Sequence, residues 1–144
     1  MKNKFLLAVL GGIIATIVMS LLMMLAVTMG MPKMSPPQMM ASTMGTGIII
    51  GWIIHFMIGI IFALMYAYII LSFLSTIKST FLKGVIFGII AFIIAQISLQ
   101  LMNFMLPNMQ MPDGNMMVIA LGSLINHIVF GIVVAYFVKP ATAS

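Results

Sequence analysis

Residues 48–74 read IIIGWIIHFMIGIIFALMYAYIILSFL, and this stretch decides the fold class. It contains no charged side chain, and it is longer than the roughly 20 apolar residues that a helix needs to cross a bilayer core of about 30 Å. Segments rich in proline, glycine or polar residues separate it from three similar stretches, 5–29, 81–106 and 116–138. The sequence therefore predicts an all-α protein, a single transmembrane domain over residues 1–144 with four spans.

The composition of the whole chain agrees with a membrane protein. Apolar residues make up 64% of the 144 residues and charged residues 5%, whereas soluble proteins carry about 25% charged residues. The chain has no cysteine, glutamate or arginine, and its one acidic residue is Asp113. These gaps exclude disulfide scaffolds, thiolate zinc sites, cysteine nucleophiles and paired-carboxylate catalysis. We therefore expect a protein that is not an enzyme.

Lysine placement predicts the orientation in the membrane. Five of the six lysines fall on one side of a four-span chain, and Lys33 falls on the other; the five are Lys2, Lys4, Lys78, Lys83 and Lys139. Because lysine near span ends favours the cytoplasmic side, both termini should be cytoplasmic. The membrane that we expect is the inner membrane. The lysines are scattered singly along the chain, so no nucleic-acid partner is expected. The N-terminus also has the charged and apolar parts of a signal peptide, but the apolar run continues to residue 29 without a convincing cleavage site, which favours a retained helix.

The two halves of the chain, 1–72 and 73–144, look like copies of one helical hairpin. A shift of 72 residues places a set of small residues and a histidine on their counterparts: Gly51, His55, Gly59 and Ala63 on Ser123, His127, Gly131 and Ala135. Such tandem hairpins would be related by a pseudo-two-fold axis along the membrane normal. Small residues also recur every four positions along each predicted helix, so these faces should meet inside a four-helix bundle.

Strongly polar residues inside the spans gather in the predicted outer half. They are the histidines His55 and His127 and the amides Gln96, Gln100, Asn103 and Asn126. Ionisable groups within a membrane are costly, so they are the first candidates for function. Two imidazoles on opposite helices indicate either a metal or haem b site, or packing residues that hydrogen-bond a carbonyl or an amide. The sequence leaves both readings open.

Methionine is the other unusual feature, with 18 residues in the chain. Two Met-x-Met motifs, Met29 with Met31 and Met109 with Met111, lie in the predicted outer loops. Thioethers are soft ligands that select Cu(I), so these residues are candidate copper ligands beside the histidines. Methionine is also a flexible apolar filler, and it recurs inside the helices, where no ligand role is needed.

Several segments resemble an uncharacterised bacterial family of small four-helix integral membrane proteins, a domain of unknown function. The similar segments are GGIIATIVMS at 11–20, MPKMSP at 31–36, GWIIHFMIG at 51–59 and SLINHIVFG at 123–131. The resemblance spans residues 11–136 and implies a four-span inner-membrane protein with no established activity. It also supports His55 and His127 as residues of interest, without assigning them a role.

Three hypotheses for function follow from these observations. The first is an accessory or structural subunit, whose partners are the lipid bilayer and other membrane subunits or further copies of the chain. The second is a haem- or copper-binding module that uses the histidines, with outer methionines assisting. The third is a small transporter or channel whose path runs near Gln96, Gln100 and Asn103.

Overall fold

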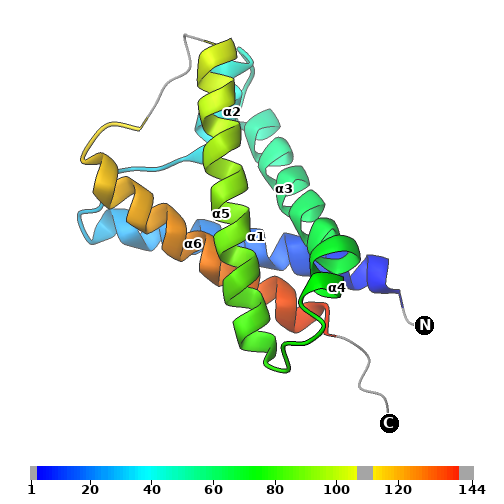
Figure 1. The fold of residues 1–144 in the computed structure, drawn as a ribbon. Helices are drawn as coiled ribbons and strands as arrows, with labels where there is room; N and C mark the ends of the chain where they lie inside the picture. The colour runs from blue at the N-terminus through cyan, green and yellow to red at the C-terminus, as the bar shows by residue number, and fades with distance from the viewer. Residues whose placement is uncertain (1–2, 107–111, 140–144) are drawn as a thin grey trace.

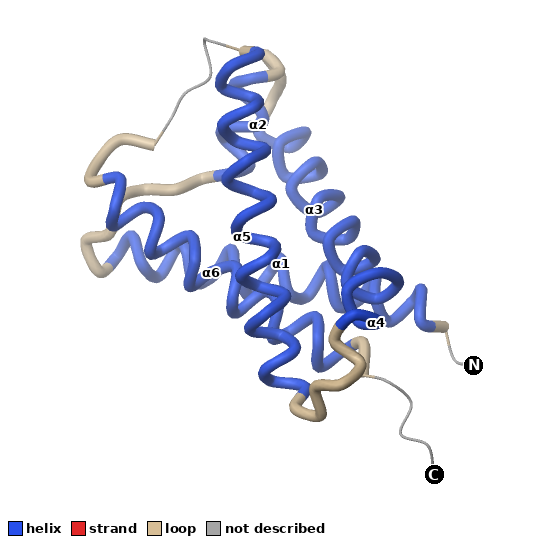
Figure 2. Tube along the Cα trace, viewed as in Figure 1, coloured by secondary structure: helices blue, strands red, loops and turns tan. Residues whose placement is uncertain are grey.

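The computed structural model describes residues 3–106 and 112–139, and all regular elements within these ranges are helical. Four helical segments are long and apolar enough to cross a membrane: α1 (Lys4–Thr28), Ile48–Phe73, α5 (Thr80–Met105) and α6 (Met116–Phe137). Each begins and ends within one residue of the span predicted from sequence. The prediction of an all-α fold with four long apolar helices is therefore confirmed (Figure 1, Figure 2).

The second span is not a uniform α-helix. It consists of α3 (Ile48–Met65), the π-helical turn η1 (Tyr66–Ile70) and α4 (Leu71–Phe73). A π turn accommodates one extra residue per turn and occurs mostly as a short insertion within an α-helix. Here it carries the fully buried Tyr66 into the middle of the bundle. The apolar pattern of the span gave no sign of this irregularity.

A short helix, α2 (Pro36–Thr43), lies in the loop after α1, where the sequence predicted only an interruption. It starts with two prolines, whose fixed φ angle and missing N–H suit the first turn of a helix. It packs against α3 at Gly51, where a Cβ would collide with the carbonyl of Pro37. The missing side chain of Gly51 therefore brings α2 down onto the bundle.

The helices cross at glycines, and the two crossings use corresponding positions. A Cβ on Gly12 in α1 would lie 2.8 Å from the Cα of Ile60 in α3. A Cβ on Gly84 in α5 would lie 2.5 Å from the Cα of Ile132 in α6. Both members of the second pair stand 72 residues after those of the first. Small residues at these points allow the backbones to touch.

We call the line of contact between two neighbouring helices a seam, and the α1–α6 seam differs from the α3–α5 seam. Helices α1 and α6 pack along each other, and a Cβ on Gly11 would come within 2.9 Å of the Cβ of Phe137 (Figure 1). The corresponding pair, α3 and α5, makes almost no close backbone approach. Tyr66 and Phe87 lie between these two helices instead, with ring centroids 4.8 Å apart. The bundle is therefore closed on one side and held apart by aromatic rings on the other.

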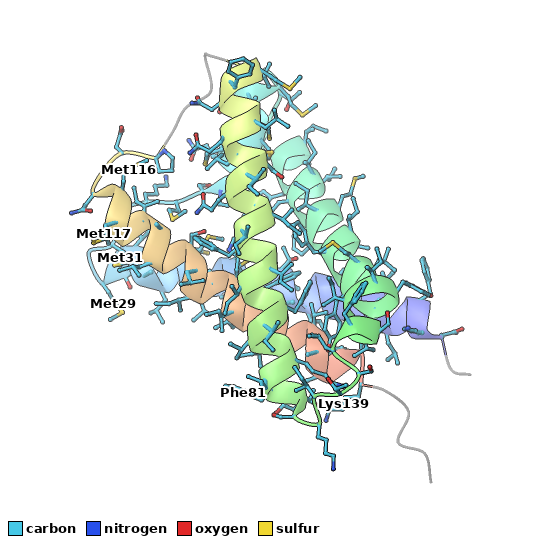
Figure 3. All side chains as sticks on the ribbon, viewed as in Figure 1. Met29, Met31, Phe81, Met116, Met117 and Lys139 are labelled. Carbon is cyan, nitrogen blue, oxygen red and sulfur yellow. The ribbon has the colours of Figure 1, made fainter. Side chains whose placement is uncertain are left out.

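The start of α1 and the end of α6 lie at the same end of the bundle, which we call the terminal end (Figure 1). Figure 3 shows Phe81 and Lys139 there, whereas Met29, Met31, Met116 and Met117 lie at the opposite end. We call this opposite end the loop end, because it carries the segments that join α1 to α3 and α5 to α6.

Candidate functional site

A cavity of about 430 Å³ occupies the half of the bundle near the loop end. Its wall is built from all four long helices together with α2, so it lies within the bundle rather than on one face. Ala91 and Ala95 on α5 contribute small side chains to the wall. Both α3 and α5, whose backbones do not approach each other closely, contribute residues to its wall.

The polar residues of the cavity wall are few and uncharged. They are Thr16, His55, Gln96, Ser98, Gln100, Ser123 and His127. No lysine and no acidic residue lines the cavity among the parts of the chain that the structure describes. The rest of the wall is apolar, so the cavity offers isolated hydrogen-bonding groups in a hydrophobic setting.

The structure brings the two predicted histidines to one cavity from two helices, His55 from α3 and His127 from α6. The imidazole of His127 is fixed by its own helix. Its Nδ1 lies 2.7 Å from the backbone carbonyl oxygen of Ser123 and 3.4 Å from the Ser123 hydroxyl. A carbonyl oxygen only accepts hydrogen bonds, so Nδ1 carries the hydrogen and donates it.

His55 is held differently. Its side chain is 8% exposed, and its Nε2 is enclosed without a hydrogen-bond partner in the described part of the chain. Its ring packs edge-on against Trp52, with centroids 6.0 Å apart. The residue four positions earlier is Gly51, which corresponds to Ser123, so no hydroxyl is available there. The two histidines thus occupy corresponding positions but make different contacts.

Six methionines also line the cavity: Met19, Met34, Met39, Met40, Met102 and Met116. None of them belongs to the two Met-x-Met motifs singled out from sequence. Met29 is 78% exposed, and Met31 lines a separate hollow of about 20 Å³. Met109 and Met111 lie outside the described residues. Only the helix and loop geometry reveals which methionines line the same cavity as the histidines.

The four amide side chains singled out from the sequence do not lie together. Gln96 and Gln100 line the cavity, as their four-residue spacing on one helix face suggested. Asn126 is buried but faces the small hollow that it shares with Met31, on the other side of α6. Asn103 lines neither space. The amides therefore do not form one cluster.

Aromatic side chains fill the bundle on the terminal side of the cavity. Phe130 lines the cavity and stands 6.3 Å from the ring of Phe87, which in turn packs on Tyr66. All three are buried, two of them completely. They form a floor beneath the cavity, so the wider space is confined to the loop half of the bundle.

Comparison with known protein families gives one match. The model of the family described as "Family of unknown function (DUF6789)" matches residues 2–143. No curated protein and no solved structure matches the chain.

Proposed function

We propose, from the premise that this chain belongs to the family of unknown function DUF6789, that it binds a small, uncharged, largely apolar molecule within the membrane. The cavity near the loop end is the binding site. One observation carries the proposal: a volume of about 430 Å³ with a mostly apolar wall and, among the described residues, no charge. Sites for small molecules typically have this size, apolar lining and few polar groups.

The absence of charge from the described wall decides the class of ligand. An ion or a charged metabolite would lose its hydration in such a cavity without gaining an opposite charge, at a cost of many kcal/mol. An apolar body loses nothing comparable, and single hydroxyl or carbonyl groups can bond to His127 or Gln96. The lining thus favours a neutral molecule with one or two polar groups.

We further propose that the protein lies in the inner membrane and that the terminal end of the bundle faces the cytoplasm. Lys4, Lys78 and Lys139 lie at or near that end, and Lys33 lies in the loop after α1. Under the positive-inside rule the cavity then belongs to the outer half of the bilayer.

The chain contains no cysteine, so single cysteines report this orientation cleanly. Ser42→Cys, at the loop end, should react with a membrane-impermeant maleimide in intact cells. Ser75→Cys, in the turn before α5, should react only after the cells are permeabilised. The reverse pattern would reject the orientation and leave the binding proposal intact.

A haem in the cavity is disfavoured by the residues present. A haem carries two carboxylates, which need cations or water, and no described lysine lines the cavity. The Nε2 atom of His55 is enclosed rather than presented to the open space. We therefore do not assign a haem to this site.

Copper is a second candidate, favoured by one specific observation. Metal-binding histidines commonly donate one ring N–H to a carbonyl and bind metal through the other nitrogen, as the bond from His127 to Ser123 would allow. Thioethers of the surrounding methionines are soft ligands suited to Cu(I). Titration of the purified protein with Cu(I) should then show binding that His127→Phe removes. Metal content that is equal in both forms would reject this candidate.

The remaining sequence hypotheses receive no specific support. An accessory role in a membrane complex stays a prediction, and it is compatible with ligand binding. We propose binding rather than passage because Phe130, Phe87 and Tyr66 fill the bundle below the cavity.

Trp52 provides the test of binding, because it is the only tryptophan and its ring packs edge-on with that of His55, which lines the cavity. Brominated neutral compounds such as 4-bromoanisole quench tryptophan at short range. In lipid nanodiscs the unmodified protein should show saturable quenching above the level expected from partition into the bilayer.

A matched pair of variants on α5 controls this test. Ala95→Phe fills the cavity and should abolish the saturable component, whereas Ile93→Phe adds the same side chain at an exposed position and should retain it. Quenching that is unsaturable, or that Ala95→Phe leaves unchanged, would reject the proposed function.

A further inference from the structure

We infer that the molecule bound in the cavity carries a hydroxyl group, of the phenol or alcohol class, which donates a hydrogen bond to Nε2 of His127. This inference rests on the proposed function and specifies its ligand. It follows from the way in which α6 fixes one histidine and from the difference between the two histidines.

The tautomer of His127 is set by the backbone. Its Nδ1 donates to the Ser123 carbonyl oxygen at 2.7 Å, so Nδ1 carries the hydrogen. The described wall of the cavity holds no carboxylate that would balance a charged ring, so the imidazole there is neutral. A neutral ring with its hydrogen on Nδ1 has a lone pair on Nε2. His127 therefore presents an acceptor.

This acceptor is open to the cavity. His127 lines the cavity, and its Nε2 makes no hydrogen bond within the described residues. It also differs from Nε2 of His55, which is enclosed by protein. The rings of Phe92 and His127 pack in an edge-to-face arrangement, with centroids 5.9 Å apart, and this contact helps to hold the orientation of His127.

Comparison with His55 explains why the hydroxyl is assigned to one histidine only. His55 stands at the position that corresponds to His127, yet no hydrogen bond within the described residues fixes its ring. Its Nε2 is buried beside Trp52 and is not presented to a ligand. Only His127 combines a fixed tautomer with an accessible lone pair.

A lone acceptor in an apolar cavity selects for a donor. A ligand without a hydroxyl removes water from Nε2 and leaves it unpaired, whereas a hydroxyl restores the hydrogen bond. Net values of about 1 kcal/mol for such a bond correspond to roughly a five- to tenfold preference in affinity. Ethers and carbonyl compounds, which only accept, gain nothing at this nitrogen.

The test compares 4-bromophenol with 4-bromoanisole, its methyl ether, by quenching of Trp52 in nanodiscs. Ligand concentrations are corrected for partition into protein-free nanodiscs. The unmodified protein should bind the phenol about five- to tenfold more tightly than the ether. His127→Phe should remove this preference, and His127→Gln, which keeps an acceptor near Nε2, should restore most of it.

Each other outcome rejects a defined part of the account. Saturable binding of both compounds with equal affinity overturns the inference and leaves the proposed function standing. A preference for the phenol that persists in His127→Phe also overturns it, because the acceptor then lies elsewhere. Saturable binding of neither compound rejects the proposed function and the inference together. The comparison of ligands on the unmodified protein holds even if His127→Phe fails to fold.

Discussion

The α1–α6 seam and the α3–α5 seam join corresponding helices, but one is closed and the other contains a cavity. On α1 the closed seam uses small residues, Ala8, Gly11 and Ala15, which are all buried. The residues 72 positions later on α5 are Thr80, Lys83 and Phe87. Small side chains let two backbones approach in a membrane, and larger ones hold them apart. The two pairs of helices thus differ in the size of the residues on one face of α1 and the corresponding face of α5.

The same comparison applies to the histidines. Both histidines line the cavity, but the residues four positions before them differ, and so do the contacts of their rings. Ser123 in one hairpin corresponds to Gly51 in the other, where α2 packs instead. The departures from symmetry, rather than the symmetry itself, create the features to which we assign function.

The largest expected effect is a difference in disulfide cross-linking between the two seams. The pair Gly11→Cys with Phe137→Cys should form a disulfide in most molecules, since the Cβ positions are 2.9 Å apart and little adjustment brings them to disulfide geometry. The corresponding pair, Lys83→Cys with Met65→Cys, should remain largely reduced. Gel mobility with and without reductant measures both. Efficient cross-linking of the second pair would mean that the α3–α5 seam is closed.

A smaller effect on stability tests whether the two glycine crossings are equivalent. Gly12→Ala and Gly84→Ala should each destabilise the protein by about 1–3 kcal/mol, because both new methyl groups meet backbone atoms within 3.0 Å. Gly47→Ala, with nothing within 4 Å, is the control and should stay within about 0.5 kcal/mol. Unfolding in detergent gives the values. A silent Gly84→Ala beside a damaging Gly12→Ala would show that the crossings are not equivalent.

The smallest expected effect comes from removing the Ser123 hydroxyl beside the imidazole of His127. Ser123→Ala removes the hydroxyl at 3.4 Å but keeps the carbonyl that receives the 2.7 Å hydrogen bond. Its cost should therefore not exceed about 0.6 kcal/mol, the average for side-chain hydrogen bonds inside membranes. Phenol binding should also survive, as Trp52 quenching would report. A loss of the phenol preference in this variant would assign the ring's orientation to the hydroxyl instead of the backbone.

The sequence predicts the long helices well and the site only in part. Apolar runs of sufficient length identify spans such as 48–74 regardless of what surrounds them, and residues four apart, such as Gln96 and Gln100, must share a helix face. The repeat also indicated that His55 and His127 would lie at corresponding places. Both histidines do line one cavity.

The parts that the sequence did not predict depend on distances between helices. The cavity is bordered by α3 and α5, which stand apart, and their spacing depends on contacts between distant parts of the chain, such as that of Tyr66 with Phe87. Met34 lines the cavity only because the loop after α1 folds back over the bundle. The bond from His127 to the Ser123 backbone was foreseeable as a general option for a buried histidine, but the choice of ring nitrogen was not.

The central claim is that the cavity near the loop end binds a neutral molecule, and the position of a bromine atom tests it most directly. Crystals grown in lipid with 4-bromophenol should show an anomalous bromine peak inside the cavity, with the phenol oxygen within hydrogen-bond distance of His127 Nε2. A cavity filled by ordered protein side chains, or bromine found only in the surrounding lipid, would contradict the account.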